Sequence, residues 1–197
     1  MSHQRWKRRL LWHRFPLRWL QSRLDRQSFL LLSGILVGLT AGLAAVLLKT
    51  AVHFINRFFI EQNPFDYPSF FLPFFPLLGI LAAVALVRRV YKGKDGKGIA
   101  RVLHAIARKS SMIPGSRMHS QLLTSSVTVG LGGSSGLEGP IVVTGAAIGS
   151  NFGRVYHVTY KDRTLLLAAG VAAGIAAVFN APIAGVMFAI EVVLAGI

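Results

Sequence analysis

The chain has 197 residues, of which 53% are hydrophobic and only 15% are charged, and its formal net charge is +15. This balance lies outside the usual range of soluble proteins and indicates a membrane protein. Cysteine is absent, so disulfides and thiolate metal sites are excluded.

The basic residues form blocks that alternate with apolar runs. Eight Lys or Arg residues precede Ser28, none lies between Phe58 and Val87, and nine lie between Arg88 and Arg117. This alternation is typical of the positive-inside rule and predicts that the N-terminus and residues 88–117 lie in the cytoplasm. We therefore expect an integral, multi-pass protein of the plasma membrane that has no nucleic-acid partner.

Residues 1–27 form a basic segment in which Trp and Leu are interleaved with Arg. This pattern predicts a helix that lies at the cytoplasmic interface of the membrane, with a disordered basic tail as the alternative. After it come four stretches without a charge, each near or above the roughly 18–20 residues that cross a bilayer. They are Ser28–Leu48, Tyr67–Val87, His119–Leu137 and Thr164–Ile190.

Two long spans are expected first. Residues 28–59 predict one tilted helix, because no helix breaker interrupts them. Its glycines at 34, 38 and 42 form a small-residue stripe that another helix can approach closely. Residues 70–91 predict the second span, which opens with Pro73 and Pro76, residues that the first turn of a helix tolerates.

Shorter and broken helices are expected from residue 96 onward. Residues 99–109 predict a helix too short and too basic to cross the membrane. A helix over 121–131 then ends in the glycine-rich segment 132–139, and further helices are expected over 140–155, 164–179 and 183–194. The sequence thus predicts an all-α membrane protein with long tilted helices followed by re-entrant half-helices, an arrangement that places ion sites near the bilayer midplane.

Glu138 is the ionisable residue inside this glycine-rich break. We expect its carboxylate to be buried at membrane depth, where an unpaired charge costs on the order of 2–3 kcal/mol. Gly136 and Gly139 leave backbone N–H groups accessible, and Pro140 suits the first turn of the next helix, so the positive end of that helix can hold an anion. The site then has two occupants, the permeating anion and the Glu138 side chain, which leaves when it is protonated. A helix-capping Glu without a transport role is the alternative.

The residues around Glu138 resemble the CLC family of chloride channels and chloride/proton exchangers. Residues 133–140, Gly-Ser-Ser-Gly-Leu-Glu-Gly-Pro, are similar to its Gly-x-Glu-Gly-Pro signature, residues 96–99 take the place of its first signature, and residues 179–191 are similar to its helix that closes the first half. The resemblance spans about residues 28–197 and implies a homodimer with one pore in each subunit, built from two inverted halves, and no cofactor. It implies that Glu138 gates a voltage-gated pore. It also implies an anion-binding set formed by Gly96, Lys97, Gly98, Ile99, Gly133, Ser134, Ser135, Gly136, Leu137, Gly139 and Pro140.

Three departures from the family pattern limit this transfer. Lys97 stands where a Ser commonly helps to bind chloride, and it acts either as an attractor of anions or as a solvated lysine. Ala100 replaces the usual Pro. In exchangers an acid often follows the position of Glu191 and accepts the proton, but here Val192 follows. This favours a channel over a proton-coupled exchanger. Glu191 is either a carboxylate at the cytoplasmic side of the pore or a structural one.

The function expected from these patterns is transmembrane transport of chloride or a similar small anion. We expect residues 28–197 to be the N-terminal half of the membrane domain, which needs a second half in order to conduct. The alternatives are a secondary transporter of another small solute and a membrane scaffold without transport. An enzyme is not expected, because no nucleophile, acid/base pair or metal cluster stands out.

Overall fold

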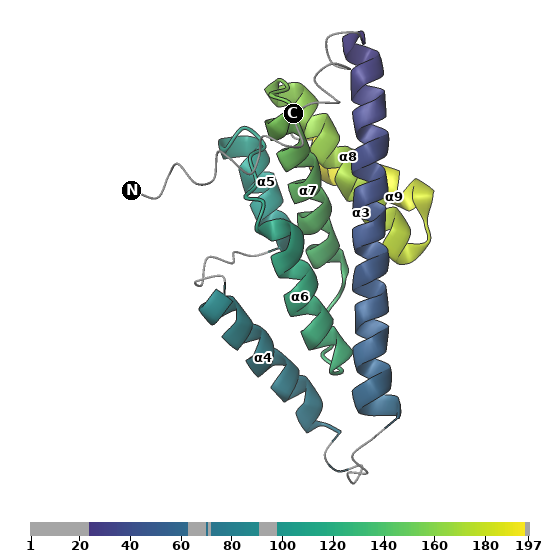
Figure 1. Cartoon of the computed structure of the whole chain (residues 1–197), viewed down its shortest axis with the longest axis vertical. Coiled ribbons are helices and arrows are strands. Elements are labelled where there is room, and N and C mark those ends of the chain that lie inside the picture. The colour runs from purple at the N-terminus through teal and green to yellow at the C-terminus, as the bar shows by residue number, and fades with distance from the viewer. Residues whose placement is uncertain (1–23, 63–69, 71, 91–97, 196–197) are drawn as a thin grey trace.

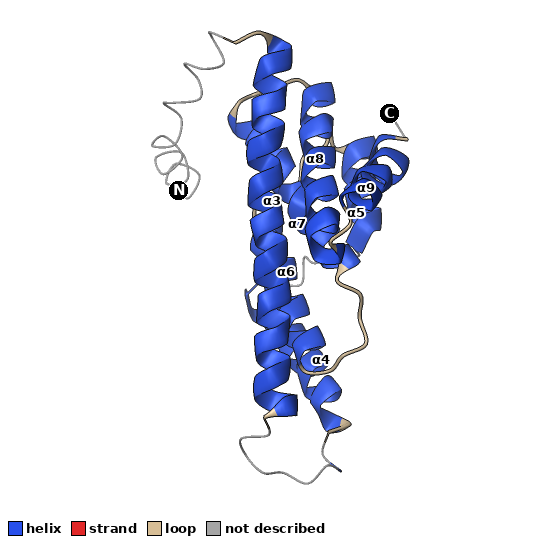
Figure 2. Ribbon diagram, turned by 90° about the vertical axis from the view of Figure 1, so that its right-hand side faces the viewer, coloured by secondary structure: helices blue, strands red, loops and turns tan. Residues whose placement is uncertain are grey.

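The computed structural model describes residues 24–62, 70, 72–90 and 98–195, and the regular elements of this part are all helices (Figures 1 and 2). In chain order these elements are α3 (Arg26–Asn56), the π-helical turn η1 (Arg57–Glu61), α4 (Phe74–Val90), α5 (Gly98–Arg108), α6 (Arg117–Gly130), α7 (Glu138–Val155), α8 (Tyr160–Phe179), α9 (Pro182–Phe188) and the π-helical turn η3 (Ala189–Leu194).

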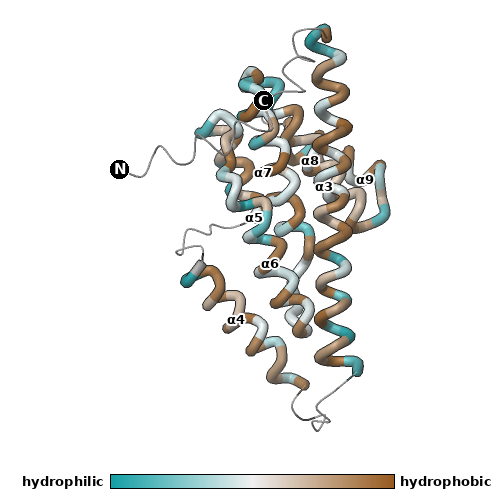
Figure 3. Tube along the Cα trace, viewed as in Figure 1, coloured by the Kyte–Doolittle hydropathy of each residue, from teal (hydrophilic) through white to brown (hydrophobic). Residues whose placement is uncertain are grey.

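α3 is the long tilted helix that the sequence predicts. Its 31 residues correspond to a length of about 46 Å, which exceeds the roughly 30 Å of a bilayer core. Leu and Ala, which have high helix propensity, dominate it, and Figure 3 shows polar residues mainly toward its two ends. By length and composition, two helical segments of the described chain can cross a membrane: α3 with η1, at a mean hydropathy of 2.3, and α8, at 1.6.

α4 is shorter than the predicted second span. It begins at Phe74, directly after Pro73, and ends at Val90, which gives 17 residues instead of the 22 expected from 70–91. Pro76 falls in its first turn, where the missing N–H has no intrahelical partner to lose. α4 packs on α6 at Gly79, where an added Cβ would lie 3.1 Å from the Cβ of Leu131.

α7 and α8 form an antiparallel hairpin at the centre of the fold, with α3 packed against α8 (Figure 1). The two helices touch backbone to backbone. A Cβ at Gly145 would overlap the carbonyl of Gly170, and a Cβ at Gly149 would overlap the carbonyl of Leu166. The glycine stripe of α3 makes closer contact at one of its three positions: a Cβ at Gly38 would lie 3.7 Å from Ala173, whereas Gly34 and Gly42 face open space.

The predicted helix breaks at 132–139 and 180–182 are both present. Gly132 has φ +86°, its N–H donates to Val129 O, and the N–H of Gly133 donates to Thr128 O, which together form a Schellman cap at the end of α6. α8 ends similarly at Asn180, which is left-handed with φ +53°. α9 then begins with Pro182 at its first position.

A buried polar network fixes the connection between α5 and α6 onto the hairpin. The hydroxyl of Ser150 on α7 donates to Ser111 O (2.6 Å) and accepts from the N–H of Ile113 (2.9 Å). Ser111 Oγ lies 2.7 Å from Thr164 Oγ1 on α8. The side-chain amide of Asn151 donates to Ile113 O (3.0 Å). These bonds satisfy backbone groups of a buried connection, which holds α5 in place beside α7.

Replacement of Ser150 by alanine is expected to lower the free energy of unfolding by about 1–3 kcal/mol, because the buried N–H of Ile113 loses its acceptor. Unfolding of the purified protein in detergent measures this change. Ser116→Ala is the matched control: Ser116 is exposed and makes no side-chain cap bond, so a change within about 0.5 kcal/mol is expected. Equal losses in the two variants would contradict the role given to Ser150.

Candidate anion site

Glu138 is the first residue of α7, two positions earlier than the helix start expected at Pro140. Leu137 is the N-cap, and within the described part of the chain no side chain caps this end of the helix. The first N–H groups of an α-helix have no partner inside the helix, and Pro140 contributes none. The N-terminus of α7 therefore presents the amides near Glu138 together with the positive end of the helix dipole.

The space in front of this helix end is open. A Cβ added at Gly136 or at Gly139 would meet no atom within 4 Å. Figure 2 shows the segment between α6 and α7 as an extended loop at the edge of the molecule. Ser134 and Ser135 on this loop are exposed. An anion can therefore approach the backbone of the loop without steric hindrance.

The expected burial of Glu138 is not found in the described chain. Its side chain is exposed, because no described residue covers the first turn of α7 on that side. The same openness that makes the amides accessible leaves the carboxylate accessible too. An exposed carboxylate is free to swing between the helix end and its surroundings.

Gly133 has a structural position at the start of the loop. Its N–H is already donated to Thr128 O at 2.9 Å, and a Cβ would come within 2.5 Å of the same oxygen. Its carbonyl accepts from the N–H of Ser135 at 2.9 Å. The amides from Gly136 to Gly139 are thus better placed to face an anion than that of Gly133.

Part of the first signature segment is described. α5 begins at Gly98, which has φ +33°, and Ile99 lies in its first turn, while Gly96 and Lys97 lie outside the described residues. Ile99 and Leu137 both pack against one buried cluster that includes Val102, Ile141 and Val142. α5 and α7 therefore pack against the same core, and Figure 1 shows the two helices next to each other.

Glu191 lies in η3 and is exposed, whereas its neighbours Ala189 and Val193 are buried in the same cluster. Val192 is half-buried. The carboxylate thus projects away from the packed side of η3. Among the described residues, no group of three or more His, Asp or Glu side chains is placed to hold a metal ion.

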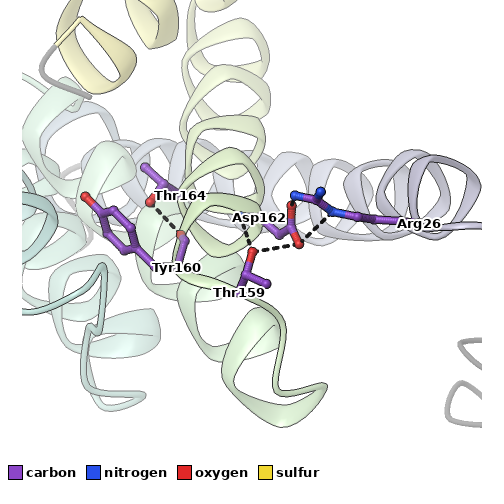
Figure 4. Close-up of polar contacts among 5 residues, drawn as sticks. All are labelled: Arg26, Thr159, Tyr160, Asp162 and Thr164. Carbon is purple, nitrogen blue, oxygen red and sulfur yellow. Dashed lines mark hydrogen bonds and ion pairs between the residues drawn. The ribbon is translucent and has the colours of Figure 1, made fainter.

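Sequence reasoning missed an ion pair at the start of α3. Arg26 Nη2 lies 2.7 Å from Asp162 Oδ1, and Arg26 Nε donates to Asp162 Oδ2 at 3.3 Å (Figure 4). Thr159, the N-cap of α8, donates its hydroxyl to Asp162 Oδ2 at 2.8 Å and accepts from the N–H of Asp162. The Thr-x-x-Asp spacing is a capping signature, but nothing in the sequence indicated that Arg26 pairs with it.

Comparison with known proteins identifies the family. Residues 78–197 match the sequence model of the family that is described as "Voltage gated chloride channel". The chain belongs to the voltage-gated chloride channel family. It is 34% identical over 174 residues to the H(+)/Cl(-) exchange transporter ClcA of Vibrio cholerae, covering 85% of this chain and 37% of that protein. It is 31% identical over 181 residues to the chloride channel protein CLC-e of Arabidopsis thaliana, which covers 85% of this chain and 24% of that protein.

A third relative is the chloride channel protein A of Dictyostelium discoideum, which is 32% identical over 181 residues that cover 79% of this chain and 21% of that protein. The chain spans little more than a third of the Vibrio relative and less of the other two. Membership of the voltage-gated chloride channel family confirms the predicted all-α membrane fold and the predicted resemblance. Members of this family are transporters and channels in membranes, and the relatives named here include both an exchanger and channels.

Proposed function

We propose that this chain contributes to a transmembrane pathway for chloride or a similar small anion and that Glu138 gates this pathway. The observation that carries the proposal is the open N-terminus of α7. Exposed amides, the positive end of a helix and one carboxylate meet there, and a Cβ at Gly136 or Gly139 would meet no atom. A helix N-terminus favours a negative charge, so an anion and the Glu138 carboxylate compete for the same place.

Two further segments support an anion site at this position. Ile99 in the first turn of α5 and Leu137 pack against the same buried cluster, and α5 contacts α7. We propose the N-terminus of α5 as a second helix end at this site. The anion-binding set we propose comprises Gly96, Lys97, Gly98, Ile99, Ser134, Ser135, Gly136, Leu137, Gly139 and Pro140, with Gly133 shaping the loop. Glu191 is a proposed carboxylate at the cytoplasmic end of the pathway.

A channel mechanism is favoured over proton-coupled exchange. A valine at position 192 cannot accept a proton, and the acid beside it, Glu191, projects away from the packed side of η3. Relatives bear the names of exchangers as well as channels, so the family alone does not decide between them.

The test is a measurement of chloride efflux and external pH together, on liposomes that hold the protein expressed from its intact gene. We expect chloride efflux without proton uptake. Efflux coupled to proton uptake would contradict the channel mechanism and leave the anion pathway standing. Absence of efflux for chloride, nitrate and fluoride would overturn the anion pathway itself.

The homodimer is likewise a proposal. α9 and the start of η3 present an apolar face of Ile183, Val186, Met187 and Ile190, spaced as i, i+3, i+4 and i+7, and these side chains are 48–81% exposed. This spacing is typical of a helix that packs against another helix. A second copy of the chain is the partner that we propose for this face.

A further inference from the structure

An apolar groove runs along the surface between the first turns of α3 and α8. It has a volume of about 670 Å³, and its lining includes Leu30, Leu31, Gly34, Ile35, Leu165 and Ala169. The residues of α3 that line it, from Gln27 to Ile35, lie on one face of the helix and extend over about 12 Å of its axis. The groove is therefore elongated along α3.

Gly34 makes this groove possible. A Cβ at this position would meet no atom within 4 Å, and the side chains at its edges are strongly exposed: Leu31 is 71% and Ile35 is 60% exposed. In a membrane protein such a hollow faces hydrocarbon, and an empty hollow forfeits the dispersion contacts that a filling chain would supply. The groove thus has the chemistry and the access of a site for an acyl chain.

A smaller polar pocket of about 330 Å³ adjoins the groove, and Leu30 lines both of them. Arg26, His157, Thr159 and Asp162 provide its polar lining. Asp162 holds the guanidinium of Arg26 through Nε and Nη2, as Figure 4 shows, and so fixes its orientation. The Arg26 side chain is still 66% exposed, which leaves Nη1 and the outer N–H of Nη2 available to a ligand.

The charge near this pocket is complementary to a phosphate. Arg154 in the last turn of α7 and Lys161 in the first turn of α8 are exposed and flank the same connection. The acid of the pocket, Asp162, is buried and already engaged by Arg26 and Thr159. The exposed charges that the structure describes around the pocket are therefore mainly basic, with Arg26, Arg154 and Lys161 against the single exposed acid Asp25. Arginine binds phosphate oxygens through several N–H groups at once, which suits it to a phospholipid headgroup.

We propose that an anionic phospholipid binds here, with one acyl chain in the groove between α3 and α8 and its phosphate on Arg26. Two contiguous features support this occupant, since the apolar groove accepts the chain and the oriented guanidinium accepts the headgroup. The Arg26–Asp162 pair then joins the starts of both helices to the lipid, and the site differs from the anion site at Glu138. Its place beside the predicted cytoplasmic block of basic residues fits a lipid of the inner leaflet.

Photolabelling of the full chain in liposomes tests the proposal. The probe is phosphatidylglycerol with a diazirine in its acyl chain, and the labelled peptides are identified by mass spectrometry. We expect labels to concentrate on residues 30–35 and 165–169 over the equally exposed Leu39 and Leu43 of α3. Gly34→Leu is expected to fill the groove and lower labelling of 165–169 several-fold. Gly42→Leu is the matched control, because it makes the same change on the same helix at another open position, and it is expected to leave the labelling of residues 165–169 unchanged.

Headgroup variants form an independent arm. Arg26→Gln is expected to abolish the preference for labelled phosphatidylglycerol over labelled phosphatidylcholine, and Arg26→Lys, which keeps the charge but not the forked N–H groups, is expected to retain part of it. The proposal would be overturned if residues 30–35 were labelled no more than Leu39 and Leu43, or if Gly34→Leu left the labelling of residues 165–169 unchanged. If the groove is labelled only after residues 1–23 are removed, that segment of the chain is its occupant and the lipid is not. If the groove is labelled only when the protein is diluted in the liposomes, a second copy of the chain is its occupant.

Discussion

Replacement of Glu138 by glutamine is expected to make chloride efflux independent of pH and to raise it at neutral pH. Glutamine has nearly the same shape but carries no charge, so it neither titrates nor competes with the anion for the N-terminus of α7. Interactions of anions with a helix N-terminus reach up to about 2 kcal/mol, so loss of the competing carboxylate should raise anion occupancy on the order of tenfold. Chloride efflux from liposomes, measured over a series of external pH values, reports both effects.

Two variants complete this experiment. Glu138→Ala is expected to give the same anion leak, because it also removes the negative charge. Glu61→Gln is the matched control, since Glu61 is likewise an exposed glutamate but lies at the C-terminal end of η1 and not at a helix N-terminus. A Glu138→Gln protein with the pH dependence of the unaltered protein would exclude Glu138 as the gate and leave its role as a helix-terminal residue.

The position of Glu138 was predictable from sequence because local chemistry dictates it. Gly132, which adopts left-handed backbone, ends α6, and with Gly133 it forms the cap that the sequence pattern favours. Pro140 restricts where α7 starts to within two residues. The same logic predicted the end of α8 at residue 179, as found, and the start of α9 at residue 183, one residue after its actual start at Pro182.

Features that depend on distant contacts were not predictable in this way. The Arg26–Asp162 pair joins residues 136 positions apart, and no local pattern specifies which basic residue meets Asp162. The exposure of Glu138 depends on what covers the first turn of α7, and no property of residues 132–140 determines that. The shorter α4 shows a third limit, since apolar character continues through Phe70 and Leu72 although the helix begins after Pro73.

The glycine stripe of α3 shows why spacing alone predicts packing incompletely. Gly34, Gly38 and Gly42 have the same spacing, and α3 contacts α8 at other positions too, such as Arg26 with Asp162, but an added Cβ would meet α8 at Gly38 and not at Gly34 or Gly42. In a helix of 3.6 residues per turn, positions four residues apart are rotated by about 40°, so the glycines one step before and after Gly38 point away from the contact. That geometry is what leaves a groove beside Gly34.

The closest helix contact of the fold predicts the largest loss of stability. Gly149→Ala is expected to lower the free energy of unfolding by about 3 kcal/mol or more, because the added Cβ overlaps the carbonyl of Leu166 and the Cα of Leu167. Both are backbone atoms, so no side-chain rotation relieves the overlap, and α7 must move away from α8. The gain in helix propensity from Gly to Ala offsets at most about 1 kcal/mol of this loss.

Unfolding in detergent, followed by the loss of monodisperse protein on heating, measures the change. Gly42→Ala is the matched control: it makes the same substitution within a helix, but at a position with no atom within 4 Å of the new Cβ, so it should unfold at the same temperature or a higher one. Equal stability of the two variants would mean that α7 and α8 lie farther apart than described. The start of α7 would then lose the support that positions Glu138, because the hairpin is the element that fixes this helix end.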